Sequence, residues 1–204
     1  MHDTELVTTI ATLMQSRQTI LPKRLVAPGP DAEQLQQILE AAASAPDHGQ
    51  LLPWRFVLVP QTARAELATA FGTALLERDA QATAEQVQQA QEKAYRSPCL
   101  LLVVVDARRG DPDIDLFERI VSTGCAVQNL LLMATALGLG SALTSGKALK
   151  SAALRTLFGL QQDEHALCFV SLGTVQSSKP GRLRPRAQDY VTTLAVPLDT
   201  PASA

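Results

Sequence analysis

The aliphatic run from Cys99 to Asp106 constrains the fold more than any other segment. Residues 100–105 read Leu-Leu-Leu-Val-Val-Val, with no polar residue at alternate positions. A strand with one wet face alternates apolar and polar residues, so this run predicts a strand buried on both faces. Helical patterns stand on either side of it without strict strand–helix–strand order. We therefore expect one α+β domain over residues 1–194, with a mixed sheet flanked by helices.

Helical periodicity and capping signals mark the other elements. Two helices are expected to begin with a capping box, Asp31 with Gln34 and Thr83 with Gln86, and the second of them is expected over residues 83–95. The longest helix is expected over residues 115–138 and is apolar on nearly every side, which predicts an interior position. Further helices are expected over residues 3–16, 62–79 and 148–158, and further strands over residues 55–59, 167–172 and 190–194. Residues 195–204 are expected to be disordered.

Composition excludes several classes of function. The chain has 204 residues, 46% of them hydrophobic, which suffices for one well-buried core. The net charge of −2 leaves no basic surplus, so nucleic acid is not an expected partner. The three cysteines lie in apolar runs without C-x-x-C spacing, which favours buried thiols in the cytoplasm over disulfides or zinc. The longest apolar stretch, residues 130–139, is too short to span a membrane.

The stretch from Ala42 to Val59 joins a helix to a strand through a short polar loop. Pro46 ends the helix because a residue before proline is pushed out of the α region. Gly49 permits backbone angles that other residues avoid. The loop therefore presents His48 between two rigid elements, where ligand-binding residues are common. The alternative interpretation, an ordinary surface turn with an exposed histidine and no function, fits the same residues.

Two groups of cations lie near the ends of the chain. Arg17, Lys23 and Arg24 occur together with the donors Gln18 and Thr19, and the set suits a phosphate group. The second group lies at residues 179–186. A solvated basic loop and a solvated basic tail are the alternative interpretations.

Neither a nucleotide-binding loop nor a catalytic side-chain constellation is recognisable. The glycine-rich residues 138–146 could lay N–H groups on an anion, but they lack G-x-G-x-x-G and a closing Lys-Ser/Thr pair, so a Rossmann or P-loop site is rejected. They also fit a helix end that leads into a strand. Ser44 and His48 are four residues apart, yet no acid is placed to orient His48. His2 and His165 have no partner at metal-ligand spacing, so no metal site is expected.

Residues 45–56, Ala-Pro-Asp-His-Gly-Gln-Leu-Leu-Pro-Trp-Arg-Phe, resemble the Ala-Pro-Ser-x-x-Asn-x-Gln-Pro-Trp-x-Phe signature of the flavin-dependent nitroreductase family. The Asp-His form is similar to its branch of short-chain NAD(P)H nitroreductases. Further segments match in the right order, from about Met14 to Val191. Residues 122–127, Ser-Thr-Gly-Cys-Ala-Val, resemble the helix at the centre of the family's dimer. The resemblance implies a nitroreductase-like fold and an interlocked homodimer with FMN at its interface.

The resemblance also implies which residues contact the flavin. Arg17, Gln18 and Thr19 stand where the family has Arg-Arg-Ser or Arg-His-Ser, which holds the phosphate and ribityl chain. Either Arg182 or Arg184 is implied to complete the phosphate site, and the sequence does not choose between them.

Other implied contacts depart from the family's pattern. His48 is kept, whereas Ser44 replaces an arginine, and both are implied to act on the flavin across the dimer interface. Leu143, Thr144 and Ser145 stand where some members have Trp-Arg-Ser, so an aromatic ring and a guanidinium are absent. This departure leaves the preference between NADH and NADPH open.

The implied activity is FMN-dependent NAD(P)H oxidoreduction by ping-pong hydride transfer to a nitroaromatic, a quinone or a similar electron-poor small molecule. The flavin carries the chemistry, and no catalytic side chain is identified. The alternative is an FMN-binding protein, a sensor or carrier without efficient turnover, which the missing Trp-Arg pair slightly favours. A structural dimer without cofactor is a third interpretation.

Overall fold

The computed structural model describes residues 4–178, 180, 181 and 183–194. The strands are β1 (Leu25–Val26), β2 (Trp54–Leu58), β3 (Cys99–Asp106), β4 (Gly140–Thr144) and β5 (Glu164–Val175). The α-helices are α1 (Thr4–Ser16), α2 (Ala32–Ala42), α3 (Arg64–Arg78), α4 (Ala84–Gln91), α5 (Leu116–Ala136) and α6 (Ala152–Leu157). Short 3-10 turns are η1 (Pro22–Arg24), η2 (His48–Gln50), η3 (Gln61–Ala63), η4 (Glu92–Tyr95), η5 (Lys147–Lys150) and η6 (Ala187–Asp189). The expected tail over residues 195–204 lies outside the described residues.

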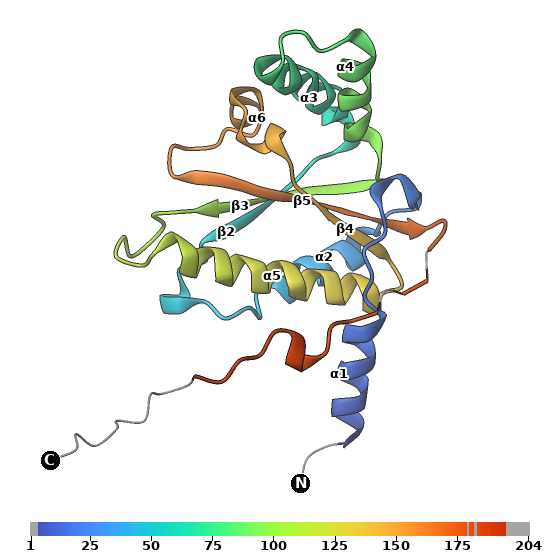
Figure 1. Cartoon of the computed structure of the whole chain (residues 1–204), viewed down its shortest axis with the longest axis vertical. Helices are drawn as coiled ribbons and strands as arrows, with labels where there is room; N and C mark the ends of the chain where they lie inside the picture. Colours follow the sequence, from blue (N-terminus) through green and yellow to red (C-terminus); the bar gives the residue numbers. More distant parts are fainter. Residues whose placement is uncertain (1–3, 179, 182, 195–204) are drawn as a thin grey trace, which may run out of the picture.

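The sheet has the strand order β1-β5-β3-β2, and β4 also pairs with β5. Helices α2 and α5 cover one face, and α3, α4 and α6 lie on the other (Figure 1). This arrangement confirms the expected α+β fold with flanking helices. Every pair of named strands is antiparallel, and the parallel component of the expected mixed sheet is confined, among the described residues, to one isolated bridge between Thr19 and Ser141.

Strand β3 is buried on both faces, as its sequence predicts. Leu101 and Val103 pack with residues of α2 and α5, whereas Leu102 and Val104 pack with residues of α3 and α6. Each of these four side chains is at most 1% exposed. Alternate residues of β3 therefore belong to two different cores. Because Leu102 is fully buried, truncating it to alanine would leave a cavity and would cost about 2–5 kcal/mol of folding free energy.

The local helix signals are confirmed. The side chains of Asp31 and Thr83 each accept a hydrogen bond from the backbone N–H three residues on, and the side chains of Gln34 and Gln86 accept one from the backbone N–H of the cap residue. The expected helix over residues 83–95 is divided, because α4 ends at Gln91 and a 3-10 turn completes it. Asp3, at the expected start of the first helix, lies outside the described residues.

The start of α5 is fixed by two side chains. Asp115 caps the helix by accepting a hydrogen bond from the Phe117 N–H at 2.6 Å. Arg119, which is 1% exposed, donates to the carbonyls of Asp106, Arg109, Asp111 and Ile114. The guanidinium thereby ties the loop between β3 and α5 to the first turn of the helix.

The expected strand over residues 190–194 is wrong. Residues 191–194 have no regular structure, and Tyr190 lies in a turn after η6. An apolar pattern forms a strand only where a sheet edge completes its hydrogen bonds, and no strand pairing forms here among the described residues. The side chains of Tyr190, Val191 and Leu194 are consequently exposed.

None of the helices within the described residues combines the length and apolar character that a membrane crossing requires.

Candidate functional site

The segment that follows α1 lies against the start of β4. Thr19 bridges to Ser141 in parallel, and the Ile20 N–H donates a hydrogen bond to the Ser141 carbonyl at 2.9 Å. Arg17 remains tied to α1, because its N–H donates to the Leu13 carbonyl at 3.2 Å. The residues implied as phosphate ligands at 17–19 therefore stand beside a strand from the second half of the chain.

The C-terminal arm reaches the same place. Nη2 of Arg184 donates to the Arg17 carbonyl at 2.8 Å. A Cβ atom added to Gly181 would lie 3.5 Å from Nε2 of Gln18, so the arm also passes close to that side chain. Arg182, the other arginine offered by the sequence, lies outside the described residues.

The two arginines in this cluster repel each other. Burial, and then the positive charge of Arg184, lower the pKa of Arg17 from its ordinary value. Within the described part of the chain, neither guanidinium has an ion-paired carboxylate. An anion between them would relieve the repulsion and accept hydrogen bonds from both side chains.

A pocket of about 510 Å³ opens where β4 ends. Thr144 and Ser145 line it, and so does Pro22, which connects it to the segment that carries Arg17. Two aromatic rings, Phe71 and Phe169, form part of the apolar wall, with centroids 5.7 Å apart in edge-to-face geometry. Such a wall suits a flat aromatic ligand.

Strand β4 connects the Arg17 segment to the pocket. Ser141 bridges to Thr19, and Thr144 lines the pocket three residues further along the strand, so these two residues of β4 are roughly 10 Å apart. Leu143 lies between these two residues and is 44% exposed. The arrangement can hold a molecule with a phosphate at one end and a planar ring at the other.

The sequence did not reveal the pocket's cations. Four basic side chains contribute to the lining, against one acid, Asp79: they are Arg78, Lys93, Arg96 and Lys147. They come from two helical segments in which the sequence showed no chemistry, and from the turn after β4. Their spacing along the chain gives no local signal, because only the packing of α3 and η4 against the end of β4 gathers them. The surplus of positive charge favours an anionic group or a ring that becomes negative on reduction.

Ser44 and His48 lie elsewhere in the chain. Nδ1 of His48 is 2.8 Å from Oε2 of Glu118, in the first turn of α5. Ser44 follows the end of α2 and is exposed. Helix α5 has 21 residues and is about 30 Å long, and the Arg17 segment lies beyond its other end (Figure 1). One chain therefore does not bring His48 to the cluster of Arg17 and Arg184.

The loop around His48 has an unusual backbone. Gly49, Gln50 and Leu52 all have left-handed φ angles, of 64°, 52° and 49°. For a residue with a side chain, this conformation costs roughly 1–2 kcal/mol. Asp47 offsets part of that cost, since its Oδ2 accepts a hydrogen bond from the Leu52 N–H at 2.6 Å. A loop held in a costly conformation is a candidate for function.

Cys99 and Cys168 offer no reactive thiolate near neutral pH. Burial raises the pKa of Cys99 and of Cys168 to about 11. Both side chains are therefore thiols under ordinary conditions and are weak nucleophiles. The expectation of inert thiols is confirmed for these two residues.

The chain is similar to several curated proteins and to solved structures. A Haemophilus influenzae protein named "Putative NAD(P)H nitroreductase" is 34% identical over 184 residues, covering 90% of this chain and 98% of the relative. A nitroreductase-like protein from Bacillus cereus superposes with a TM-score of 0.77 at 19% identity, covering 91% of this chain and 95% of that one. A nitroreductase with bound FMN from Desulfitobacterium hafniense DCB-2 gives 0.64 at 22% identity, covering 91% and 97%.

The family assignment rests on the sequence comparisons, and the superpositions agree with it in fold. Residues 15–174 match the family model described as "Nitroreductase family". This range contains the Arg17 segment, the His48 loop and the residues of the pocket. The chain belongs to the nitroreductase family.

Proposed function

We propose that this protein is an FMN-dependent NAD(P)H oxidoreductase that reduces nitroaromatics, quinones or similar electron-poor acceptors. The observation that carries the proposal is the convergence of Arg17 and Arg184, two arginines without a carboxylate partner among the described residues, on a segment that bridges to β4, at whose end a basic pocket with an aromatic wall opens. The name of the Haemophilus influenzae relative and the FMN bound to the Desulfitobacterium hafniense structure support the choice of donor and cofactor.

The residues fit FMN at both of its ends. Arg17 and Arg184 hold the phosphate through charge-assisted hydrogen bonds, and Gln18 and Thr19 add neutral donors. Thr144 and Ser145 meet the ring at the mouth of the pocket. When bound, FMN accepts a hydride from NADH or NADPH and passes it to the acceptor, which enters the same slot after the nicotinamide leaves.

The pocket's cations assist the electron transfer. A reduced flavin carries negative charge on its ring, and fixed positive charges in a partly dry pocket stabilise that charge. Lys93 and Lys147 both line the pocket, one from η4 and one from η5. Their side chains lower the free energy of the reduced state without forming a bond to substrate.

The active form is a homodimer in which Ser44 and His48 act on the flavin held by the other copy. The separation of about 30 Å along α5 supports this assignment. Apolar side chains that one chain leaves exposed support it as well, among them Val7 and Met14 on α1 and Phe117 and Val121 on α5. Large exposed apolar surfaces usually belong to interfaces. We assign the dimer to the cytoplasm, where thiols stay reduced.

An FMN-binding sensor or carrier is the second candidate. Leu143 and Thr144 replace the Trp-Arg pair seen in some members, and Leu143 is 44% exposed beside the pocket. A weaker nicotinamide site would leave the protein able to hold flavin without rapid turnover.

The visible absorption spectrum of the freshly purified protein tests the proposal. We expect a yellow protein whose flavin bands bleach within seconds when NADH or NADPH is added without air, and return on addition of a quinone. Bands that persist after both donors would favour the sensor or carrier. A protein that stays colourless after incubation with FMN would contradict both candidates.

A further inference from the structure

The hydrogen-bonded pair of His48 and Glu118 contributes little to holding the chain together. Nδ1 of His48 is 2.8 Å from Oε2 of Glu118, and the two side chains are 67% and 56% exposed. An exposed pair of this kind contributes little to folding stability. It does fix the imidazole, because a carboxylate only accepts hydrogen bonds, so the proton must be on Nδ1. The opposite nitrogen, Nε2, is left to face a ligand.

Glu118 stands on a rigid support. It lies in the first turn of α5, between Phe117 and Arg119. The Phe117 N–H donates to the capping carboxylate of Asp115, and the Arg119 guanidinium donates to four backbone carbonyls. A side chain on a helix end held in this way has little freedom to follow a moving partner. The geometry of the pair is consequently set from the helix side.

The His48 loop is held from its own side as well. Asp47 closes it through the Leu52 N–H, and Leu51 packs so tightly against the neighbouring loop that a Cβ atom at Gly110 would lie 2.5 Å from its Cδ2. Two non-glycine residues, Gln50 and Leu52, keep left-handed backbones here. A loop and a helix end are thus both fixed so that one exposed imidazole keeps one orientation.

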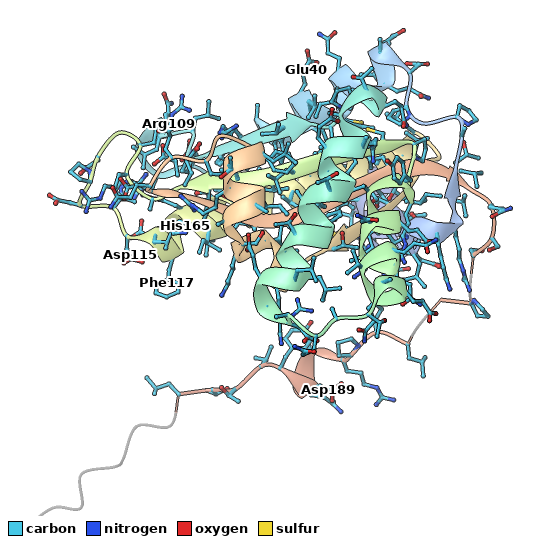
Figure 2. All side chains as sticks on the ribbon, turned by 90° about the horizontal axis from the view of Figure 1, so that it is seen from above. Glu40, Arg109, Asp115, Phe117, His165 and Asp189 are labelled. Atoms are coloured by element: carbon cyan, nitrogen blue, oxygen red, sulfur yellow. The ribbon has the colours of Figure 1, made fainter. Side chains whose placement is uncertain are left out.

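The surroundings of the pair are those of an interface. Phe117 and Val121 on α5 are 76% and 65% exposed, and Leu52 is also largely exposed. Figure 2 shows Phe117 projecting from the start of α5, away from the body of the molecule. A second copy that covers these apolar groups would also remove the His48–Glu118 pair from water. A hydrogen bond to a carboxylate is stronger in such a low-dielectric environment than in water.

We propose that Glu118 is a positioning residue for flavin binding: its carboxylate holds the His48 imidazole so that Nε2 meets the flavin of the second copy. The inference rests on the proposed function, because it needs FMN at the dimer interface. It adds a residue that no motif of the sequence identified and assigns it a role through His48 alone.

The test compares four variants of the full-length protein: Glu118→Gln, His48→Gln, the double variant, and Glu66→Gln as a control. Glu66, like Glu118, is an exposed acid in the first turn of a helix, but α3 lies on the other face of the sheet (Figure 1). The control therefore reproduces the lost charge at a helix start. The readouts are the FMN dissociation constant, the position of the visible flavin bands, and the ¹⁵N shifts of the His48 ring without flavin.

We expect Glu118→Gln to weaken FMN binding about tenfold and to shift the flavin bands, as the loss of a charge-assisted hydrogen bond predicts. The double variant should bind no worse than His48→Gln, because Glu118 acts only through His48. Without flavin, the wild-type His48 ring should carry its proton on Nδ1, and Glu118→Gln should release it to exchange between both nitrogens. Glu66→Gln should match the wild type in every readout.

Three results would overturn the assignment. Wild-type affinity and bands in Glu118→Gln, with weak binding in His48→Gln, would show that His48 needs no positioning. Additive losses in the double variant would show that Glu118 acts without His48. A wild-type His48 ring that already exchanges between tautomers would remove the premise. In each case the proposed FMN site at Arg17 would stand, whereas a wild-type protein that binds no FMN would end that proposal as well.

Discussion

The cluster at Arg17 and the pair at His48 are organised in opposite ways. Arg17 meets Arg184 from the far end of the chain, and two segments distant in sequence complete one anion site. His48 is held by its own loop and by Glu118, and it faces outward. One region is gathered within the chain, whereas the other presents an exposed group at its surface. In the homodimer that we propose, each chain would carry these two unequal halves of a site.

The largest effect is expected at the complete half. Arg17→Ala removes a charge-assisted contact to the phosphate and should weaken FMN binding by about 100-fold. Fluorescence titration of the apoprotein with FMN measures this loss. Lys150→Ala is the control, because Lys150 is an exposed cation that does not line the pocket, and this variant should bind FMN normally. Full flavin occupancy in Arg17→Ala after dilution would refute the phosphate assignment.

Mixing two damaged chains tests whether the halves come from different copies. A heterodimer of Arg17→Ala with His48→Gln contains one site with both native residues and one site with neither. Equal mixing should therefore restore about a quarter of the wild-type sites, given random pairing in a symmetric dimer. NADH-dependent quinone reduction before and after mixing provides the measurement. No recovery in a mixture that forms heterodimers would place both groups in the same chain's site.

A smaller effect is expected from the pocket. Lys93→Glu places negative charge near the ring and should slow flavin reduction about tenfold while phosphate binding persists. Stopped-flow bleaching at saturating NADH and NADPH reports the rate. Lys150→Glu is a suitable control, because Lys150 is exposed in η5 but does not line the pocket. Equal slowing in both variants would indicate that the reversed charge acts through the overall electrostatic field of the protein and not from within the pocket.

The smallest effect on function is expected at a pair to which no role in the site is assigned. Arg55 binds Glu164 through Nε at 2.6 Å and Nη2 at 2.9 Å, and this contact is the main cause that lowers the pKa of Glu164. The ionised pair stabilises the fold above the unfolded pKa of about 4.3, and this contribution is lost as pH falls through the lower folded pKa.

Glu164→Gln should therefore lower the free energy of unfolding near neutral pH by about 1–2 kcal/mol, since half-exposed Arg55 can be rehydrated. The loss should shrink in acid, and FMN affinity should be unchanged. Thermal melts across the acid range measure both trends. Asp163→Asn breaks only the exposed contact with Arg108 at 3.5 Å and should leave the melting temperature nearly unchanged. A constant deficit in Glu164→Gln at every pH would contradict the assignment.

The local parts of the fold could be predicted from sequence, whereas the long-range parts of the site could not. The capping boxes at Asp31 and Thr83 and the doubly buried β3 depend on neighbouring residues or on periodicity. Lys93 and Arg96 gave no signal, because tertiary packing alone brings them to the end of β4. The strand expected over residues 190–194 was wrong. Its apolar pattern suits a strand, but among the described residues no edge of the sheet pairs with it.

The implied site residues divide along the same line. The resemblance implied Arg17 and either Arg182 or Arg184; the fold brings Arg184 to Arg17, and Arg182 lies outside the described residues. It implied Ser44 and His48 too, and their distance from Arg17 within one chain could not be read from spacing. Glu118 escaped notice because an acid at the start of a helix usually serves the helix dipole.

Arg119 has a consequence for how this surface can change over evolution. Its guanidinium grips main-chain oxygens, which every amino acid possesses, and touches no side chain of the loop in those four bonds. These four bonds therefore place no demand on the side chains of residues 107–113, although Gly110 is constrained by its left-handed φ of 72° and by the close approach of Leu51. Homologous chains could vary the other side chains of this loop and keep the backbone path that leads to Glu118.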